Sequence, residues 1–484
     1  MNKEILELEP KVVWKNFSKL NAVPRPSKRE ERVIQFAMDF GKSLGLETFK
    51  DEVGNVIIRK PATTGMENRK MITLQSHLDM VHQKNNDTVF DFETQGIAML
   101  AEDDWVKAKG TTLGADNGMG VAAILSLLES TSIPHPPLEA LFTIDEETGM
   151  TGAQGLKPGV LQGEILLNLD TEEDDEIDIG CAGGIDITAS RTYPQISTPT
   201  NSSAYKVIVK GLQGGHSGMD IHKGLGNANK IMNRLLLGSV NSHNIGIAKI
   251  DGGSLRNAIP RESVSIIVVS EENETAFVRD FEALAIEIKR EFAIVEKQMQ
   301  LELEVVALPE AIMDPLIQNK VLRAIYAAHN GVYLMSTAIP DLVATSNNIA
   351  RVRIGDGNIH IGCLTRSSIE SSKNDLATSL QSVFELAGCE IRLSGEYPGW
   401  QPNPKSPILK ILKEQYTSLF NEKPKVVACH AGLECGILGQ HYPNLDMISF
   451  GPTIKGAHSP DERVSISSVQ KFWKYLLEIL KNTP

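Results

Sequence analysis

The chain has 484 residues, of which 41% are hydrophobic and 23% are charged, and its formal net charge is -13. This composition is typical of a globular protein and excludes a largely disordered chain, while the length predicts two domains. The acidic balance argues against a general nucleic-acid binder, which needs a basic face. It also argues against binding to an anionic lipid surface. We therefore expect neither nucleic acid nor membrane among the partners.

The start of the chain and its cysteines predict a cytoplasmic location. The acidic start MNKEILELEP lacks the apolar core of a signal peptide, and no apolar run reaches the length of a membrane-spanning helix. The five cysteines are scattered and form no CxxC pair. This spacing is typical of reduced core thiols in a reducing compartment.

The first predicted element is a helix that begins near Ser27. Ser27 and Glu30 have the spacing of a capping box. Apolar residues then follow at helical intervals, at Val33, Phe36, Ala37, Phe40 and Leu44. A second helix is predicted over residues 118–128.

Three short apolar runs then lead directly into metal-type side chains. Residues 71–75 precede His77, residues 138–144 precede Glu146 and Glu147, and residues 164–169 precede Asp170. Each run has the character of a buried strand in an α/β sheet. Ligands bind outside the carboxyl ends of such strands, so the pattern predicts a site at that edge.

The residue pattern of the chain changes after residue 183. A turn-rich stretch (STPTNSS, residues 197–203) opens a region of strands and helices, and a second strand-helix set at about 317–393 suggests a weak internal duplication. A cluster of breakers (PGWQPNP, residues 398–404) ends this region, and strand-like runs then return. We predict an α/β domain of residues 1–183 and 399–484, interrupted by an inserted α+β domain of residues 184–398.

Residues that commonly bind metals gather in six short segments. These are His77-Leu-Asp79, Gly114-Ala-Asp116-Asn-Gly118, Asp145-Glu146-Glu147, Asn168-Leu-Asp170, Gly214-Gly-His216-Ser-Gly218 and Gly456-Ala-His458-Ser-Pro460. A two-metal hydrolase needs a bridging carboxylate, ligands that leave room for water, and a base that is not itself a ligand. The inventory meets these needs, with Asp116 as the bridge and with the candidate ligands His77, Asp116, Glu147, Asp170 and His458.

Spacing leaves two questions of geometry open. Asp79 can fix the tautomer of His77 through the far ring nitrogen, or it can share a strand face with His77 as a second ligand. Glu146 and Glu147 point in opposite directions on an extended chain, so one can ligate while the other faces the substrate water. Asp145 is interpreted as a helix cap or a turn residue.

Each of these signals is weak by itself. An isolated His-x-Asp is more often structural, and an acidic run is usually a solvated face. Most of the acidic stretch 172–178 is interpreted in that way, as a solvated exit from a strand. The combination of ligand-type residues at successive strand ends is what favours catalysis.

Taken together, the motifs resemble those of the M20 metallopeptidases. The matching segments are SHLDMV, GTTLGADNGMG, TIDEETGMTGA, NLDTEE, GLQGGHSGMDI and FGPTIKGAHSPDERV. They are most similar to the aminoacyl-histidine (Xaa-His) dipeptidase branch, and the resemblance covers essentially the whole chain. It implies a zinc-peptidase catalytic domain with a central mixed sheet flanked by helices, interrupted by a lid or dimerisation domain.

The resemblance also implies roles for the residues of the catalytic domain. The residues that match the zinc ligands are His77, Asp116, Glu147, Asp170 and His458, with Asp116 bridging two Zn²⁺ per subunit. Co²⁺ or Mn²⁺ could replace zinc with these ligands. Asp79 matches the residue that orients His77, and Glu146 matches the general base. The family pattern further implies a cis peptide bond between Asp116 and Asn117.

In the inserted domain the resemblance implies substrate contacts. His216 matches a histidine that stabilises the tetrahedral intermediate, and Arg366 and Asn257 are similar to residues that hold the substrate's terminal carboxylate or carbonyl. Gly432 matches a loop that offers backbone contacts. The same domain implies a possible homodimer.

The implied function is a metallodipeptidase that hydrolyses unblocked dipeptides, with Xaa-His dipeptides such as β-alanyl-histidine (carnosine) expected, by a zinc-bound water that Glu146 activates. The alternative is an N-acyl amino acid deacylase or desuccinylase of the same fold. The length of the insert and the HAGLECG loop favour the dipeptidase. A non-catalytic metal-binding protein is a further alternative, and the presence of both Glu146 and His216 argues against it.

Overall fold

The computed structural model describes residues 4–85, 87–337 and 339–484, so the first three residues of the acidic start lie outside it. The chain forms two compact units. Unit 1 comprises Met1–Gly180, Trp400–Ala428 and Leu433–Pro484, and unit 2 comprises Cys181–Gly399 and Cys429–Gly432. From the sequence we expect residues 429–432 in the second part of the α/β domain, within 399–484. They group with unit 2 because the Ala182 N–H bonds to the carbonyls of Cys429 and Ala431, at 2.9 and 3.0 Å.

The main sheet of unit 1 is mixed, as expected, and has the strand order β1-β2-β6-β3-β7-β23-β8-β22. Its strands are β1 (Glu47–Lys50), β2 (Val56–Lys60), β3 (Ile72–His77), β6 (Leu138–Thr143), β7 (Ile165–Asn168), β8 (Glu176–Cys181), β22 (Lys425–Cys429) and β23 (Asp446–Ser449). The central strands β6, β3, β7 and β23 run parallel to one another. Every residue of β3, β6 and β7 is buried, in agreement with the buried strands predicted from the three short apolar runs.

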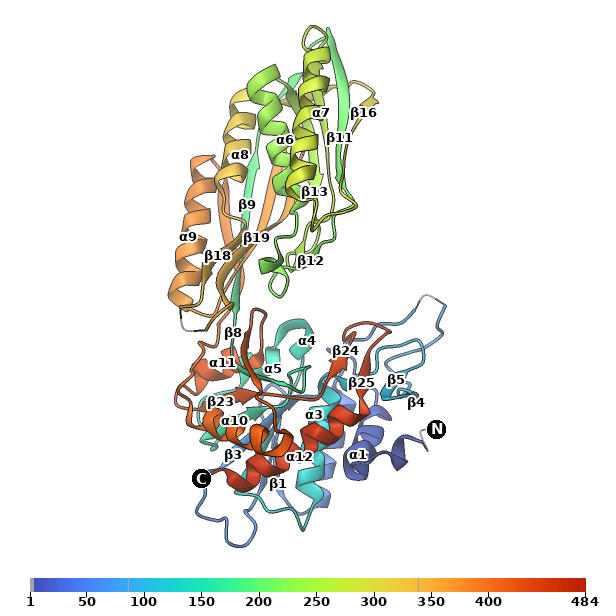
Figure 1. Cartoon of the computed structure of the whole chain (residues 1–484), viewed down its shortest axis with the longest axis vertical. Coiled ribbons are helices and arrows are strands. Elements are labelled where there is room, and N and C mark those ends of the chain that lie inside the picture. Colours follow the sequence, from blue (N-terminus) through green and yellow to red (C-terminus); the bar gives the residue numbers. More distant parts are fainter. Residues whose placement is uncertain (1–3, 86, 338) are drawn as a thin grey trace. The chain divides into compact units, whose positions relative to one another are not determined.

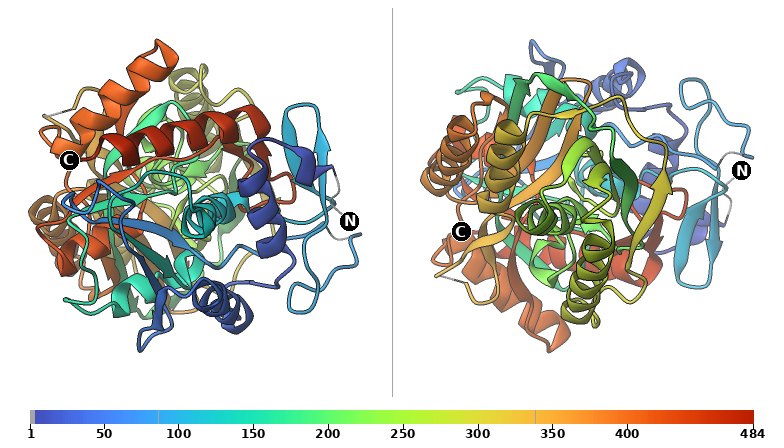
Figure 2. Two further views of the ribbon diagram at one scale, coloured as in Figure 1. Left: turned by 90° about the horizontal axis from the view of Figure 1, so that it is seen from below. Right: turned by 90° about the horizontal axis from the view of Figure 1, so that it is seen from above.

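The helices of unit 1 pack on its sheets and on one another. They are α1 (Lys11–Asn21), α2 (Glu31–Ser43), α3 (Ala115–Glu129), α4 (Glu146–Gly149), α5 (Thr151–Gly155), α10 (Pro407–Phe420), α11 (Glu434–His441) and α12 (Ile466–Asn482), with a 3-10 turn η1 (Ile5–Glu7). Helix α3 is mostly apolar and is buried at every residue except Asp116 and Glu129, as expected of a central helix. Figure 2 shows the C-terminal helix α12, in red, running across unit 1. In the described part of the chain, no helix has the length and apolar character needed to cross a bilayer.

A small second sheet of unit 1 has the order β24-β25-β5-β4. Its strands are β4 (Met99–Glu102), β5 (Trp105–Ala108), β24 (Ile454–Lys455) and β25 (Arg463–Ser465). The turn between β24 and β25 carries His458, so this sheet positions one of the predicted ligands.

The predicted start of the helix near Ser27 is wrong. Helix α2 begins at Glu31, and its cap is not the predicted capping box. The Glu30 carboxylate instead accepts the N–H of Lys28 at 2.8 Å, and Lys28 has a positive φ of 68° that turns the chain before the helix. The Ser27 hydroxyl is therefore free to donate to Asp79, at 2.8 Å.

Unit 2 is built on one large antiparallel sheet with the order β16-β11-β15-β13-β19-β20-β9-β21, and β18 also pairs with β19. The strands of the unit are β9 (Gly183–Thr192), β10 (Gln195–Ser197), β11 (Ser202–Lys210), β12 (Gly215–His216), β13 (Gly246–Gly252), β14 (Ala258–Ile259), β15 (Ser263–Ser270), β16 (Gln300–Val306), β17 (Ala311–Met313), β18 (Gly331–Met335), β19 (Val343–Gly355), β20 (Asn358–Ser367) and β21 (Glu390–Tyr397). Its helices are η2 (Ile221–Lys223), α6 (Ala228–His243), α7 (Glu274–Glu291), α8 (Pro315–Ala327) and α9 (Glu370–Leu386). Figure 1 shows α6, α7, α8 and α9 lying along one face of this sheet, where they share a continuous apolar core with it.

The topology of unit 2 has the form of an internal duplication. From one edge the sheet reads β16-β11-β15-β13, and from the other edge it reads β21-β9-β20-β19. Each half has the chain order strand-helix-strand-strand-helix-strand, with α6 and α7 in one half and α8 and α9 in the other. The halves meet where β13 pairs with β19. Strand order therefore reveals a repeat that the sequence only suggests.

Candidate metal centre

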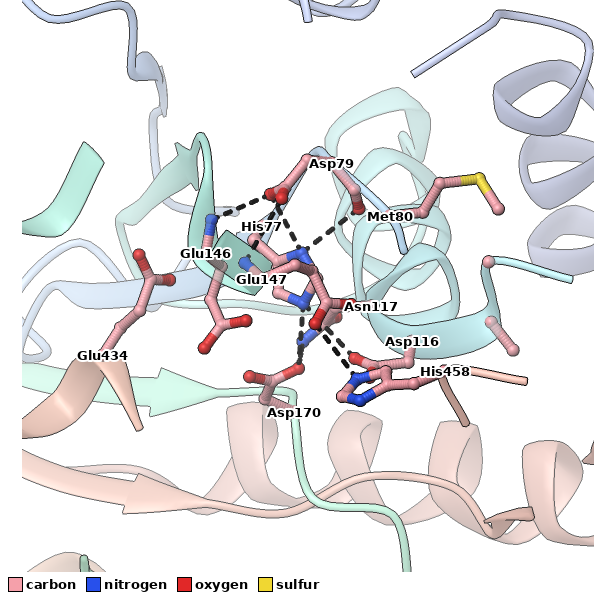
Figure 3. Close-up of polar contacts among 12 residues, drawn as sticks. His77, Asp79, Met80, Asp116, Asn117, Glu146, Glu147, Asp170, Glu434 and His458 are labelled. Atoms are coloured by element: carbon pink, nitrogen blue, oxygen red, sulfur yellow. Dashed lines mark hydrogen bonds and ion pairs between the residues drawn. The ribbon is translucent and has the colours of Figure 1, made fainter. Parts of the chain in front are cut away.

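The predicted ligands of unit 1 converge at the carboxyl edge of its parallel strands. His77 ends β3, Asp170 follows β7, and Glu147 lies in the short helix that follows β6. Parallel strands end at one edge of a sheet, so these side chains become neighbours although they are far apart in sequence. Asp116 joins them from the start of α3, and His458 joins them from the turn after β24 (Figure 3).

Asp116 faces two separate sets of ligand-type atoms with its two carboxylate oxygens. Its Oδ1 lies 3.3 Å from His77 Nε2, which is in turn 3.6 Å from Asp170 Oδ1. Its Oδ2 lies 3.1 Å from His458 Nε2, which is 3.0 Å from Glu147 Oε2. Within each set the ligand atoms all lie within 4.8 Å of one another. The arrangement can hold two cations that share Asp116.

The backbone at Asp116 is shaped to present this carboxylate. Asp116 and Asn117 have non-helical dihedral angles, so the regular helix begins after them, in agreement with the predicted range 118–128. The peptide bond between them is cis, as the family resemblance implies. The Asn117 side-chain amide donates to Asp170 Oδ1, which ties the two carboxylate-bearing segments together.

Asp79 lies on the far side of the His77 ring from these sets. His77 Nδ1 lies 3.2 Å from the backbone carbonyl oxygen of Asp79 and 3.3 Å from its Oδ1, while His77 Nε2 faces Asp116 and Asp170. Among the described residues, the groups able to hold a metal do not include Asp79. Of the two geometries left open by spacing, the structure therefore favours an orienting role over a second ligand.

The expectation that Glu146 and Glu147 lie on extended chain is wrong. Both begin the short helix α4, so their side chains diverge by helical rotation rather than by strand alternation. The N–H groups of Glu146 and Glu147 donate to the two oxygens of Asp79, at 3.1 and 3.3 Å. Glu147 Oε2 lies 3.0 Å from His458 Nε2, whereas Glu146 belongs to a different group of ligand-type atoms, with His77 and Glu147 (Figure 3). Asp145 is the residue before this helix and accepts the hydroxyls of Thr148 and Thr151.

The electrostatics of the cluster are those of a site that attracts positive charge. Hydrogen bonds to Asp116 and Glu147 raise the pKa of His458 to about 11. Burial alone would lower the pKa of His77, but the carboxylates of Asp170 and Asp116 outweigh it and raise that pKa well above its usual value. Burial and the charge of Asp116 raise the pKa of Glu147. Divalent cations would satisfy these crowded acceptors.

A buried acceptor of the cluster gives a second test of fit. Among the described residues, Glu147 Oε1 is buried and has no hydrogen-bond partner. A carboxylate oxygen left in this state is costly, and coordination of a cation removes the cost. The imidazole and carboxylate donors, together with this orphaned oxygen, fit a two-metal centre.

The predicted substrate-contacting residues lie in unit 2. His216 Nδ1 accepts the backbone N–H groups of Gly218 and Met219, so its Nε2 carries the proton in the neutral ring. That Nε2 lies 3.5 Å from Arg366 Nη2. Two donors this close favour an anionic acceptor that both can reach.

Arg366 is itself held by a residue that sequence reasoning missed. It is only 4% exposed, and its Nη1 donates to the Tyr397 hydroxyl at 2.7 Å. Asn257 is attached to the His216 segment through its backbone carbonyl, which accepts the Ser217 N–H at 2.8 Å, while its side chain is exposed. Gly432 lies in the loop 429–432 and is half-buried.

The family model for Peptidase family M20/M25/M40 matches residues 73–482 of the chain. The matched range includes every segment of the metal-type cluster. The chain belongs to this family of peptidases. The mixed sheet and the inserted unit are the M20 fold that the sequence motifs predicted.

Two relatives of this M20 peptidase match over its whole length. The cytosol non-specific dipeptidase of Escherichia coli (strain K12) is 44% identical over an alignment of 484 positions that covers 99% of each protein. The crystal structure of aminoacylhistidine dipeptidase from Vibrio alginolyticus is 43% identical, has a TM-score of 0.93, and aligns over 100% of this chain and 98% of that one. A tripeptidase from Staphylococcus aureus, at 17% identity and a TM-score of 0.56, shares the fold.

The stretch 172–178 of this M20 peptidase, most of which we expect to be a solvated strand exit, is half-buried over residues 172–176 and buried at residues 177 and 178. Burial, together with the charge of Asp116, raises the pKa of Glu172 to about 8. Asp178 lies inside β8, is 6% exposed, and accepts the Thr171 hydroxyl at 2.8 Å. An acidic run has no apolar periodicity, so nothing in the sequence separates its buried members from its exposed ones.

Proposed function

We propose that this M20 peptidase is a two-metal dipeptidase that hydrolyses unblocked dipeptides, including Xaa-His dipeptides such as β-alanyl-histidine. The observation that carries the proposal is the position of Asp116, whose two oxygens face two separate histidine-carboxylate pairs. A shared carboxylate between two ligand sets is what a two-metal hydrolase requires. Likeness over the full length to two dipeptidases supports peptide-bond hydrolysis of short substrates. The name of the E. coli relative supports a cytoplasmic location.

The chain offers three protein ligands to each of two Zn²⁺ ions. His77 and Asp170 would hold one ion, Glu147 and His458 would hold the other, and Asp116 would bridge them. Imidazole and carboxylate donors suit Zn²⁺ and also accept Co²⁺ or Mn²⁺. When bound, the ions would supply Lewis acidity, which makes water nucleophilic near neutral pH and polarises the scissile carbonyl.

Glu146 is the residue that we assign to proton transfer. Its carboxylate lies in one group with His77 and Glu147, with the ligand-type atoms within 4.8 Å, yet it stands outside the two sets that share Asp116. Burial raises the pKa of Glu146 well above its usual value, and the charges of Asp170 and Glu147 add to the effect. A carboxylate oxygen of Glu146 can therefore accept a proton from the attacking water and return it to the leaving amine.

Recognition of the substrate is assigned to unit 2. We propose that Arg366 binds the C-terminal carboxylate of the dipeptide and that His216 donates a hydrogen bond to the oxyanion that develops during attack. Asn257 and Gly432 are proposed to add contacts to the substrate backbone. A guanidinium that requires the terminal carboxylate would restrict the enzyme to very short peptides. A lid or dimerisation role for unit 2 is part of the same proposal.

The decisive experiment is a substrate panel for the full-length protein with added Zn²⁺ and after chelation. Dipeptides that end in histidine are compared with N-acetyl and N-succinyl amino acids, and release of the free amino acid is measured. We expect metal-dependent hydrolysis of the unblocked dipeptides and none of the N-acyl compounds. Preference for the N-acyl compounds would instead establish a deacylase, and no turnover of either class would leave a metal-binding protein without catalysis.

A further inference from the structure

Glu462 is a buried carboxylate that binds a row of backbone N–H groups. Its Oε2 accepts the N–H of Leu113 at 2.7 Å and of Gly114 at 3.0 Å. Its Oε1 accepts the N–H of Ala115 at 2.7 Å and of Asp116 at 3.3 Å. The side chain is 2% exposed. One carboxylate thus fixes the four successive amides that lead up to the shared carboxylate of the cluster.

Arg25 is a buried cation that binds backbone carbonyl groups of the same loop and of the segment after His77. Its Nη1 donates to the carbonyls of Leu78 and Asp79, at 3.1 and 3.0 Å, and its Nη2 donates to the carbonyl of Gly114 at 2.5 Å. The side chain is 1% exposed. Arg25 therefore joins the segment after His77 to the segment before Asp116.

Glu462 and Arg25 bind the same residue, Gly114, from opposite sides. The N–H of Gly114 is held by Glu462 and its carbonyl is held by Arg25. Gly114 has a φ of 68°, and a Cβ atom there would lie 2.5 Å from Arg25 Nη2. Glycine is required at this position both for the left-handed backbone and for the close approach of the guanidinium.

Glu462 also belongs to the segment that carries His458, four residues earlier in the chain. His458 has a φ of 64°, a region that residues other than glycine rarely adopt, so its conformation depends on what surrounds it. The amides bound by Glu462 fix where this segment lies relative to Asp116. A change at residue 462 would therefore move His458 and Asp116 with respect to one another.

We propose that Glu462 and Arg25 are positioning residues that hold His77, Asp116 and His458 at metal-binding separation. The inference rests on the metal centre of the proposed function. Neither side chain contacts the ligand atoms. Each acts on the backbone of the loops, and together they join three segments that are remote in sequence.

The chemistry of this arrangement requires a carboxylate at residue 462. All four groups that it binds are donors, so both oxygens must accept. In a Glu462→Gln variant, one oxygen becomes an NH₂ group that faces two backbone N–H groups, and those lose their acceptor. The loop would move to relieve this contact, and Asp116 would move with it.

Glu139 supplies a matched control within the same unit. It is 0% exposed, and its carboxylate accepts the backbone N–H groups of Gln162 and Gly163 at 3.0 and 3.3 Å. It stands near the start of β6, whereas Glu146 and Glu147 follow the end of that strand. A Glu139→Gln variant therefore loses the same kind of carboxylate–amide contact away from the cluster, and it also loses the ion pair with Arg59, whose Nε lies 3.0 Å from Glu139 Oε1.

The test measures Zn²⁺ affinity of the metal-free full-length protein by competition with a chromophoric chelator, beside its thermal unfolding without metal. We expect both variants to lose stability, but only Glu462→Gln to raise the Zn²⁺ dissociation constant, by about 10- to 100-fold. Excess Zn²⁺ should restore part of the activity of that variant. If Glu462→Gln does not fold, Glu462→Asp and Glu139→Asp provide the same comparison, because the shorter carboxylate cannot span all four amides.

The wild-type measurement distinguishes failure of the positioning role from failure of the proposed metal centre. Wild-type protein that binds two Zn²⁺, with a Glu462 variant that binds them equally well, would overturn the positioning role alone. Equal weakening in the Glu139 variant would also overturn it, because the effect would then be a general loss of packing. Wild-type protein that binds no Zn²⁺ would overturn the metal centre itself, and the positioning role with it.

Discussion

The Nδ1 atom of His77 lies 3.3 Å from a carboxylate oxygen of Asp79, on the side of the ring that faces away from the ligand cluster. The same carboxylate accepts the N–H groups of Glu146 and Glu147. It also accepts the hydroxyl of Ser27, and it is fully buried. One side chain thus fixes both the ring of a proposed ligand and the turn that carries the proposed base.

Replacement of Asp79 by Asn should weaken the site without removing a ligand. The amide can accept through one atom only, so it cannot serve the ring and both N–H groups of the turn. We expect kcat/KM for a dipeptide to fall about 10- to 100-fold, with weaker Zn²⁺ binding. Steady-state kinetics and metal titration of the purified variant measure both effects. Kinetics and metal affinity like those of the wild type would show that Asp79 does not orient His77.

Replacement of Glu146 by Gln should separate metal binding from catalysis. Without a carboxylate to move the proton, kcat should fall by about 10²- to 10⁴-fold. The metal content of the variant should stay at the wild-type level, because Glu146 stands outside the two sets that share Asp116.

Glu147→Gln is the contrast for that experiment, since Glu147 Oε2 lies 3.0 Å from His458 Nε2 within the proposed ligand set. The Glu147→Gln variant should lose bound metal as well as turnover. Metal analysis of both proteins, beside their kcat values, distinguishes the roles. A Glu146 variant that retains substantial turnover would disprove its role as the base.

The sequence predicts that His77, Glu147 and Asp170 lie near one another because strand ends converge by geometry alone. Once β3, β6 and β7 are recognised as parallel strands, the residues that follow them must meet at one edge. Asp116 and His458 do not follow from that rule. They enter from a helix start and from a turn, and they are candidates because of their residue types and short glycine-rich segments, to which the family motifs add support.

What sequence could not predict are contacts made by backbone groups and by buried polar side chains. Arg25 and Glu462 act on carbonyls and amides, which every residue has, so no residue pattern marks the partners. Ser27 and Glu30 have capping-box spacing, yet a positive φ at Lys28 redirects both side chains. Local spacing is a weak guide where tertiary contacts compete for the same hydrogen bonds.

A substitution at Tyr397 tests the proposed carboxylate-binding role of Arg366 in unit 2. Its contact with Arg366 Nη1 sets the orientation of a nearly buried guanidinium. In Tyr397→Phe, loss of a hydrogen bond to a charged group should raise KM for dipeptides by about tenfold, with little change in kcat. A dipeptide amide, which lacks the terminal carboxylate, should be affected much less.

Tyr205→Phe is the control for this variant, because Tyr205 also lies in unit 2 and donates its hydroxyl to Glu274 at 2.6 Å. We expect that control to keep the wild-type KM. Kinetics on a matched pair of dipeptide and dipeptide amide measure the difference. Equal effects on both substrates would mean that Tyr397 does not act through the terminal carboxylate.

Asp178 should make the stability of the protein depend on pH. Burial, together with the nearby charge of Glu176, raises its folded-state pKa to about 7, whereas an unfolded aspartate has a pKa of about 3.9. The folded protein therefore holds a proton that the unfolded chain releases between these values. Its contribution to stability is complete below about pH 4 and is lost as the pH rises through about 7.

Asp178→Asn should remove this dependence, because the amide stays neutral and can still accept the Thr171 hydroxyl. The variant should become more stable than the wild type as the pH rises, and the difference should widen by on the order of 2–3 kcal/mol between pH 5 and pH 8. Denaturant unfolding of both proteins in the presence of a chelator measures it, since metal binding then does not add its own pH dependence. A constant difference across this range would show that Asp178 is ionised in the folded protein, and that the Thr171 hydroxyl compensates for its burial.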